Sequence, residues 1–291
     1  MRPTIVRDPA ALDAFHGGAF VPTMGALHEG HAALLRRAAT IAHASCRPDS
    51  PTAPVVLSIF VNPTQFAPGE DFDRYPRTFE ADVALASGAG ATAIFAPEVA
   101  TIYPPDAAVA APALPLVATD PGLEDAARPA HFAGVCQVVA RLFDLIRPRW
   151  AIFGEKDYQQ LQVIRAMVAA ERPRWGDLEI VAQPTIRDDD GLAMSSRNRY
   201  LAPESRDAAL ALSRALQAAA AAQHPRTAEA IMRRMLEFHG LAVEYAVVRD
   251  AETLLPVESL ERPTRALIAA RLLSGGATVR LIDNQAMPVW C

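Results

Sequence analysis

Short apolar runs alternate with amphipathic stretches over residues 1–185 of the chain. The apolar runs have strand length, and we expect strands at Ala19–Thr23, Val55–Val61, Thr92–Phe95, Ala151–Phe153 and Leu178–Val181. One amphipathic stretch places its apolar side chains on a single helical stripe, formed by Phe132, Val135, Val138, Val139, Leu142, Phe143 and Ile146. Strands that alternate with helices predict a Rossmann-like α/β fold, a doubly wound parallel sheet with right-handed crossovers.

The pattern changes after Thr185. Two helices are expected, at Pro203–Ala222 and Thr227–His239, and three strands follow, at Val243–Val248, Arg265–Ala270 and Thr278–Ile282. We therefore expect a first domain over residues 1–185 and a smaller α+β C-terminal domain over residues 186–291. Two Pro-rich segments predict exposed loops, Arg47–Pro54 and Ala107–Pro115.

Composition narrows the class of protein. The 291 residues are 51% hydrophobic and 21% charged, which is an ordinary globular composition, and the net charge is -5. A mildly acidic chain without a basic block predicts no nucleic-acid or membrane-surface partner. The chain has neither a signal-peptide pattern at its start nor a membrane-length apolar run, so we expect a cytoplasmic protein. The three cysteines, Cys46, Cys136 and Cys291, lack metal-ligand spacing and predict simple burial in a reducing compartment.

The segment PTMGALHEGH, residues 22–31, lies between a predicted strand and a predicted helix. The free amides at a helix start favour anions, and His28 and His31 add side-chain donors. Gly30 between them would let a base or phosphate approach closely. Two surface histidines near a turn are the structural alternative, and a zinc site is less favoured because the spacing is not i,i+4 and no third ligand follows nearby.

Two further strand ends carry polar motifs. The run SIFVNPTQF supplies Asn62 and Gln65, whose amides can orient the hydroxyls and carbonyls of a small molecule, although alone this run is only a turn. The run FGEKDYQQ could use Glu155 and Asp157 as helix caps. A lysine in a first helical turn opposes the helix dipole, so Lys156 is better explained if it faces a phosphate or carboxylate.

The segment DDDGLAMSSRN, from residue 188, combines acids with hydroxyls and a cation. Adjacent loop carboxylates repel one another, so the three aspartates predict a solvated turn and not a metal site. Ser195, Ser196 and Arg197 suit a triphosphate or pyrophosphate, and a helix N-cap is a compatible structural role. Arg128 and His131 precede the long helix, and this pair also favours an anion.

Read together, these segments resemble the pantothenate synthetase (pantoate–β-alanine ligase) family of the HIGH-type nucleotidyltransferase superfamily. The resemblance rests on PTMGALHEGH, SIFVNPTQF, YPRT, RPAHFAGV, FGEKDYQQ and DGLAMSSRNRYL in the family's order, and on the C-terminal runs at residues 248–251 and 281–284. It implies that pantoate attacks the α-phosphorus of ATP to give pantoyl adenylate and pyrophosphate. The amine of β-alanine then displaces AMP to give pantothenate, and no protein nucleophile is needed.

The resemblance also implies roles for individual residues. ATP binding is expected from Met24, Gly25, His28, His31, Gly154, Lys156, Asp157, Met194, Ser195, Ser196 and Arg197. The catalytic groups among them are expected to be His28, His31, Lys156, Ser195, Ser196 and Arg197. Pantoate binding is expected from Met24, Asn62, Gln65, Arg128, His131 and Gln160. Mg²⁺ would bridge phosphates, with Asp82 after YPRT as the protein contact, and the family implies a homodimer. Because Ser195–Arg197 lie beyond the domain boundary, we also expect the C-terminal domain to act as a lid.

One departure from the family pattern is visible, and two alternative functions stay open. Residues 123–131 hold alanines where the family often has glycines, which bears on loop flexibility near pantoate. One alternative is a nucleotidyltransferase that transfers AMP or CMP to a phosphate, but that would call for more basic residues and would not need the glutamine pair. A non-catalytic nucleotide-binding protein is the other alternative, and it should have lost Lys156 or a histidine.

Overall fold

The computed structural model describes residues 2–45, 52–66 and 72–290. Its larger sheet has six parallel strands in the order β1-β4-β3-β2-β5-β6. Their bounds are β1 Thr4–Val6, β2 Ala19–Thr23, β3 Val55–Ile59, β4 Ala93–Phe95, β5 Trp150–Gly154 and β6 Glu179–Gln183. The five strands predicted for this sheet are all present, with ends shifted by at most two residues, and β1 was missed because three residues make too short a pattern.

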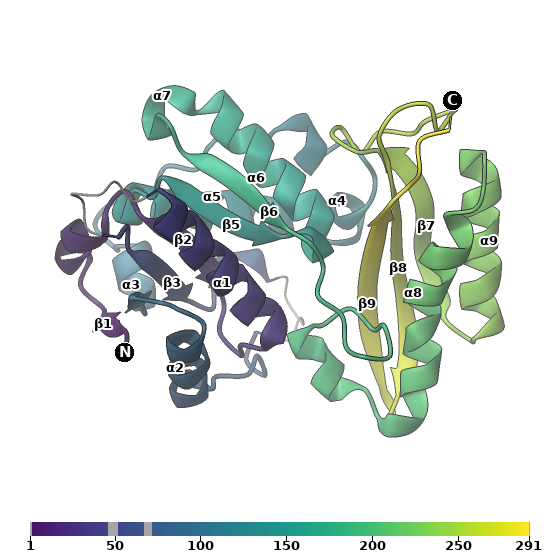
Figure 1. Ribbon diagram of the computed structural model, residues 1–291, viewed down its shortest axis with the longest axis horizontal. Helices are drawn as coiled ribbons and strands as arrows, with labels where there is room; N and C mark the ends of the chain where they lie inside the picture. The colour runs from purple at the N-terminus through teal and green to yellow at the C-terminus, as the bar shows by residue number, and fades with distance from the viewer. Residues whose placement is uncertain (1, 46–51, 67–71, 291) are drawn as a thin grey trace.

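Helices cover both faces of this sheet (Figure 1). Side chains alternate across a strand, so Phe20 packs with α5 (His131–Ile146) and α6 (Tyr158–Ala170), while Ala19 and Val21 pack with α1 (Glu29–Ala44) and α2 (Phe79–Gly88). The short helices are α3 Val99–Ile102, α4 Glu124–Ala127 and α7 Arg172–Trp175. The predicted doubly wound α/β fold is confirmed.

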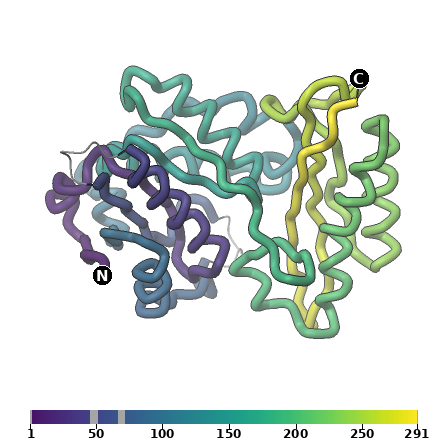
Figure 2. The backbone as a smooth tube through the Cα atoms, viewed as in Figure 1, coloured from purple at the N-terminus to yellow at the C-terminus, as the bar shows by residue number. Residues whose placement is uncertain are grey.

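The smaller sheet is antiparallel, in the order β7-β8-β9, with bounds Ala242–Asp250, Thr264–Ser274 and Ala277–Ala286. Helices α8 (Arg206–Ala219) and α9 (Pro225–Phe238) pack on one face of it around a separate apolar core. On the other face, Leu267, Tyr245 and Val247 join the core of the larger sheet. The segment between β6 and α8 runs along the junction of the two parts (Figure 2).

The strand order reverses between β2 and β5, which lie side by side at the centre of the larger sheet. In open α/β sheets ligands bind beyond the carboxyl ends of the strands at such a switch point. The histidine motif follows β2 and Lys156 follows β5, so the topology brings both to one crevice. Residues 107–115 form a loop as predicted, whereas most of Arg47–Pro54 lies outside the described residues. In the part of the chain that the structure describes, no helix is long and apolar enough to cross a membrane.

Candidate active site

The carboxyl ends of the central strands open into a cavity of about 250 Å³. Every predicted site residue except Gly25 and Asp82 lines it, namely Met24, His28, His31, Asn62, Gln65, Arg128, His131, Gly154, Lys156, Asp157, Gln160, Met194, Ser195, Ser196 and Arg197. These residues come from the segments that follow β2, β3 and β5, from the start of α5, and from residues 194–197 beyond β6. The structure therefore gathers the motifs that sequence spacing could only suggest were neighbours.

His28 and His31 form a reciprocal cap at the start of α1. The backbone N–H of Gly30 donates to Nδ1 of His28 (3.1 Å), and the backbone N–H of His28 donates to Nδ1 of His31 (3.2 Å). An Nδ1 that accepts a hydrogen bond leaves the ring proton of a neutral histidine on Nε2. Both rings, whose centroids are 4.1 Å apart, therefore offer an Nε2–H to a ligand.

Protonation of these rings is disfavoured. Burial, followed by the charge of Lys156, lowers the pKa of His28 to about 4. Burial, followed by His28, lowers the pKa of His31 to about 3. At neutral pH the pair is uncharged and acts through hydrogen bonds, and only Lys156 and nearby arginines supply positive charge.

In the unliganded protein the imidazole signals of His28 and His31 are expected to stay unchanged between about pH 5.5 and about pH 8, as followed by NMR. In the urea-unfolded chain both should titrate near the ordinary value of about 6.5. Because the folded pKa values are lowered, the stability that these rings contribute is present above pH 6.5 and is lost as the pH falls toward about 4 for His28 and about 3 for His31. A folded-state titration near pH 6.5 would contradict the capped, neutral arrangement.

The packing of the His28 ring also requires a glycine at position 30. A Cβ at this position would lie 2.8 Å from Cε1 and 2.9 Å from Nδ1 of His28. The glycine makes room for the His28 ring to fold back over the helix start. Gly30 also lines the cavity, so the predicted close approach of a base or phosphate stays a prediction.

Asp82 lies beneath the histidine loop, outside the residues that line the cavity. Its carboxylate accepts the backbone N–H groups of Ala26 (3.1 Å) and Leu27 (2.8 Å) and the hydroxyl of Thr78 (3.0 Å). The residue is 2% exposed, and Ala26 holds a left-handed φ of 51°. This geometry supports an anchor for the Gly25–Leu27 turn and does not support the predicted magnesium contact. Across the described ranges, no group of three or more His, Cys, Asp or Glu side chains could hold a metal ion.

Asp82→Ala is expected to destabilise the protein by about 3 kcal/mol, because two buried amides lose their acceptor. Adenylation should fall with it, while the Mg²⁺ concentration for half-maximal rate should stay unchanged. Urea unfolding and a Mg²⁺ titration measure the two effects, with Thr78→Val as the variant that removes one hydroxyl and leaves the carboxylate. A raised Mg²⁺ requirement in a stable Asp82→Ala protein would instead restore the metal-contact hypothesis.

Lys156 sits in a single turn of 3-10 helix, Glu155–Asp157, that links β5 to α6. It is the one lysine in a sequence whose other basic residues, apart from histidine, are all arginine. Its side chain is 20% exposed, and Nζ lies 4.0 Å from the carboxylate of Asp157. Neither acid of the turn caps α6 as the sequence suggested, and Glu155 pairs with Arg265 instead (2.9 Å).

Ser195 is the N-cap of the turn Ser196–Tyr200, and its hydroxyl accepts the backbone N–H of Arg197 (3.2 Å). The structural role foreseen for this motif is confirmed. Two of the three preceding aspartates are not a simple solvated turn, because Asp188 and Asp190 both accept hydrogen bonds from Arg206 (2.7 and 2.6 Å). These two contacts of Arg206 hold the loop that leads to Ser195, Ser196 and Arg197.

Gln65 is oriented by its neighbours. Nδ2 of the buried Asn62 donates to Oε1 of Gln65 (3.2 Å) and to the carbonyl of Gly134 (3.2 Å), and the Gln65 amide nitrogen donates to the sulfur of Met24 (3.1 Å), which leaves its second N–H for a ligand. Position 134 requires a glycine, since a Cβ there would overlap the carbonyl oxygen of Thr64 and lie 2.7 Å from the backbone nitrogen of Gln65. His131 Nδ1 donates to the Gln65 carbonyl oxygen (3.1 Å), so the loop is held from three sides.

Two groups of lining residues were missed. The apolar stripe of α5 was predicted only as one face of a helix, and four of its residues, Val135, Val138, Val139 and Leu142, also form an apolar wall of the cavity. The segment 183–186 after β6 lines it as well. The strand-end argument would have found this segment, because β6 is parallel to the other strands and ends at the same edge.

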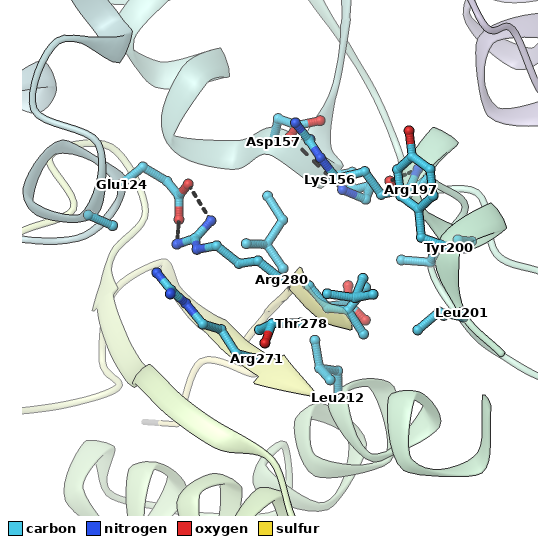
Figure 3. A pocket seen from close by; sticks show the side chains of 18 of the residues that line it. Glu124, Lys156, Asp157, Arg197, Tyr200, Leu201, Leu212, Arg271, Thr278 and Arg280 are labelled. Carbon is cyan, nitrogen blue, oxygen red and sulfur yellow. Dashed lines mark hydrogen bonds and ion pairs between the residues drawn. The ribbon is translucent and has the colours of Figure 1, made fainter. Parts of the chain in front are cut away.

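A second cavity, of about 740 Å³, lies between the two sheets and adjoins the first. The two share walls formed by Arg128, His131, Lys156, Asp157, Gln160, Ser195 and Arg197. Its far wall comes from β8 and β9, where Arg280 makes a bidentate pair with Glu124 (2.8 and 2.6 Å) (Figure 3). Lys156 and Arg197 lie on its opposite side in the same view.

The Pantoate-beta-alanine ligase family profile matches residues 6–286. This chain belongs to the pantoate–β-alanine ligase family. The pantothenate synthetase of Rhizorhabdus wittichii is 48% identical over 274 residues, which cover 92% of this chain and 90% of that protein. That of Myxococcus xanthus is 48% identical over 279 residues, covering 94% and 89%.

Solved structures of the family agree. The pantothenate synthetase of Thermus thermophilus superposes with a TM-score of 0.84 at 43% identity, covering 97% of this chain and 98% of that one. The ligase of Francisella tularensis, solved with beta-gamma ATP and beta-alanine, gives 0.74 at 27% identity and covers 97% of each chain. The resemblance inferred from the motifs is thus confirmed over nearly the whole length.

Cys136 is buried on α5, and burial raises the pKa of its thiol to about 12. A thiol of that pKa is neither a nucleophile nor a metal ligand at neutral pH. The prediction of simple burial is confirmed for this residue. Cys46 and Cys291 lie outside the described residues.

Proposed function

We propose that the chain ligates pantoate and β-alanine with ATP, through a pantoyl adenylate formed in the cavity at the β2–β5 switch point. The observation that carries this proposal is the convergence of two kinds of group on one cavity. Phosphate-binding groups come from His28, His31, Lys156 and the Ser195–Arg197 loop. Amides suited to a hydroxy acid come from Gln65 and Gln160 on the adjacent wall.

In the first half-reaction a carboxylate oxygen of pantoate bonds to the α-phosphorus, and the bond to the bridging oxygen of pyrophosphate breaks. Negative charge on the phosphate oxygens must be stabilised in place, because both reacting groups belong to substrates. The Nε2–H groups of His28 and His31 are donors fixed by the α1 cap. Lys156 adds a compact positive charge, and Arg197 with Ser195 and Ser196 completes the anion site. Met24, Gly25, Gly154, Asp157 and Met194 are proposed to border the nucleotide.

Pantoate carries two methyl groups beside its hydroxyls, so its site needs an apolar side and a polar side. Val135, Val138, Val139 and Leu142 of α5 offer the apolar side. The amide nitrogen of Gln65 and the side chain of Gln160 offer hydrogen bonds, and among the described residues Gln160 makes no other side-chain hydrogen bond. Asn62, Arg128 and His131 orient Gln65 from behind.

Mg²⁺ would enter with ATP and would neutralise charge on its phosphates, with Asp157 as the acid available in the cavity lining. Mg²⁺ commonly keeps several waters and binds substrate phosphates with one or two carboxylates at most. The side chains that line the cavity, mostly donors with Asp157 as the acid, fit an ion held chiefly by the nucleotide.

In the second half-reaction the amine of β-alanine attacks the acyl carbon, and AMP leaves with one of the original carboxylate oxygens. The larger cavity adjoins the shared wall of Lys156, Gln160 and Arg197, and is a route by which β-alanine reaches the adenylate. The homodimer is proposed from the family and is tested by light scattering. Closure of the C-terminal domain is proposed too, and equal protease sensitivity of the junction near residue 186 with and without ATP plus pantoate would contradict it.

Product analysis separates this reaction from a phosphate-acceptor transferase. The protein, ATP and Mg²⁺ are mixed with pantoate, with pantoate plus β-alanine, or with a phosphorylated acceptor. Pyrophosphate that requires pantoate, followed by AMP and amide that require β-alanine, supports the ligase. Pyrophosphate formed only with the phosphorylated acceptor would overturn it.

A further inference from the structure

β9 of the C-terminal sheet carries two adjacent buried polar residues, Asp283 and Asn284, against the active site. They are 3% and 4% exposed, and they belong to the run LIDN, to which the reaction assigns no role. Buried polar side chains are stable only when their hydrogen bonds are made, so their partners show what they hold.

Asn284 binds the backbone of the Glu155–Asp157 turn, which carries Lys156. Its Nδ2 donates to the carbonyl oxygens of Glu155 (2.9 Å) and Lys156 (2.8 Å), and its Oδ1 accepts Nε of Arg265 (2.7 Å). Arg265 in turn pairs with the Glu155 carboxylate (2.9 Å) and lies 4.1 Å over the ring of Tyr158. The Lys156 turn is thus fastened at its backbone by a residue of the other sheet.

Asp283 holds the segment that leads into the Ser195–Arg197 loop. Its carboxylate accepts both terminal nitrogens of Arg187 (2.6 and 3.0 Å), and Arg187 also donates to the carbonyl oxygen of Gly191 (3.1 Å). Arg187 and Ala193 form an antiparallel bridge, which closes a tight hairpin. Met194 and Ser195 follow this hairpin directly and enter the cavity.

We propose that Asp283 and Asn284 are positioning residues that set the separation of the Lys156 turn and the Ser195–Arg197 loop. Neither lines the smaller cavity in which the phosphates are proposed to bind, and each acts through the segment it holds, Asn284 through backbone carbonyls and Asp283 through Arg187. This inference rests on the proposed function, in which both segments stabilise the phosphates of ATP. A displacement of catalytic groups by about 1 Å is enough to slow a reaction about 100-fold.

Asn284→Asp is the sharpest variant, because it keeps the shape and replaces the donating amide with an oxygen that repels the two carbonyls. Single-turnover pantoyl adenylate formation is expected to slow about 100-fold. Aminolysis of supplied pantoyl adenylate by β-alanine should change less than about threefold, since the β- and γ-phosphates play no part in that step. A role only in stability would lower both steps by the same fraction of folded protein.

Controls make the outcome decisive. Thr264→Val removes a buried hydroxyl on neighbouring β8 that has no hydrogen-bond partner, and it should leave both steps unchanged. Asn284→Ala tests the same contacts if the Asp variant does not fold, and Asp283→Asn tests the contact between Asp283 and Arg187. Since Lys156 is the one lysine, an amine reagent modifies it alone besides the α-amino group, and its modification rate should change in Asn284→Asp.

Folded Asn284 variants with wild-type adenylation and wild-type Lys156 reactivity would overturn the positioning role. So would equal slowing of both half-reactions. Failure of the wild-type protein to use pantoate would instead overturn the proposed function, so the two failures are distinguishable.

Discussion

Lys156→Ala is expected to slow pantoyl adenylate formation by about 100- to 1,000-fold while the fold survives. The side chain lines the same cavity as the histidine pair and the Ser195–Arg197 loop, and it is proposed to compensate charge that grows as pyrophosphate leaves. Its side chain is only partly buried, so truncation removes little packing. Single-turnover pyrophosphate release with saturating ATP and pantoate measures the effect.

Lys156→Arg tests whether charge alone suffices. Arginine keeps the charge but spreads it over a planar fork, so we expect at most partial recovery of the rate. Arg226→Ala is the matched control, because it removes one cation from a 90% exposed side chain on α9. Normal adenylation by folded Lys156→Ala would remove this residue from the mechanism. Amine modification offers an independent test, since it should inactivate the enzyme and ATP should protect the single lysine.

His31→Asn is expected to slow adenylation by about 100-fold with a small change in stability. The Asn Oδ1 can still accept the backbone N–H of His28, so the capping arrangement at α1 is kept. What is lost is the Nε2–H that is proposed to donate to the phosphates. Thermal unfolding and single-turnover adenylation separate the two effects.

His43→Asn is the matched control for this prediction, because it makes the same substitution at an exposed position on the same helix. It should leave adenylation unchanged. A His31→Asn protein with a wild-type rate would show that the ring at position 31 serves the cap alone. A large loss of stability without a rate effect in the remaining folded protein would lead to the same conclusion.

The fold was predictable because its strongest signals are local. Strands such as Ala19–Thr23 are short apolar runs, and the α5 stripe repeats at helical spacing. The three-residue β1 was not predictable, since it is defined by its pairing with β4 rather than by its own pattern. The change in the hydrophobic pattern near residue 185 predicts two parts of the chain, but it does not predict how these two parts move.

The candidate site was predictable in its residues and less so in their contacts. Motifs at strand ends point to one edge of a parallel sheet, which is why Lys156 and the histidines could be grouped. The magnesium contact at Asp82 was implied by the resemblance alone, and nothing in the sequence indicated the contacts that its carboxylate makes with the amides of Ala26 and Leu27. Asn284 could not be assigned, since its role depends on carbonyls more than a hundred residues away.

The most direct test of the proposed reaction follows a carboxylate oxygen. Pantoate labelled with ¹⁸O in its carboxylate is incubated with the protein, ATP, Mg²⁺ and β-alanine, and the products are analysed by mass spectrometry. Attack at the α-phosphorus predicts one ¹⁸O in AMP and the other in the amide carbonyl of the product. Label in inorganic phosphate, or AMP without label, would contradict the adenylate.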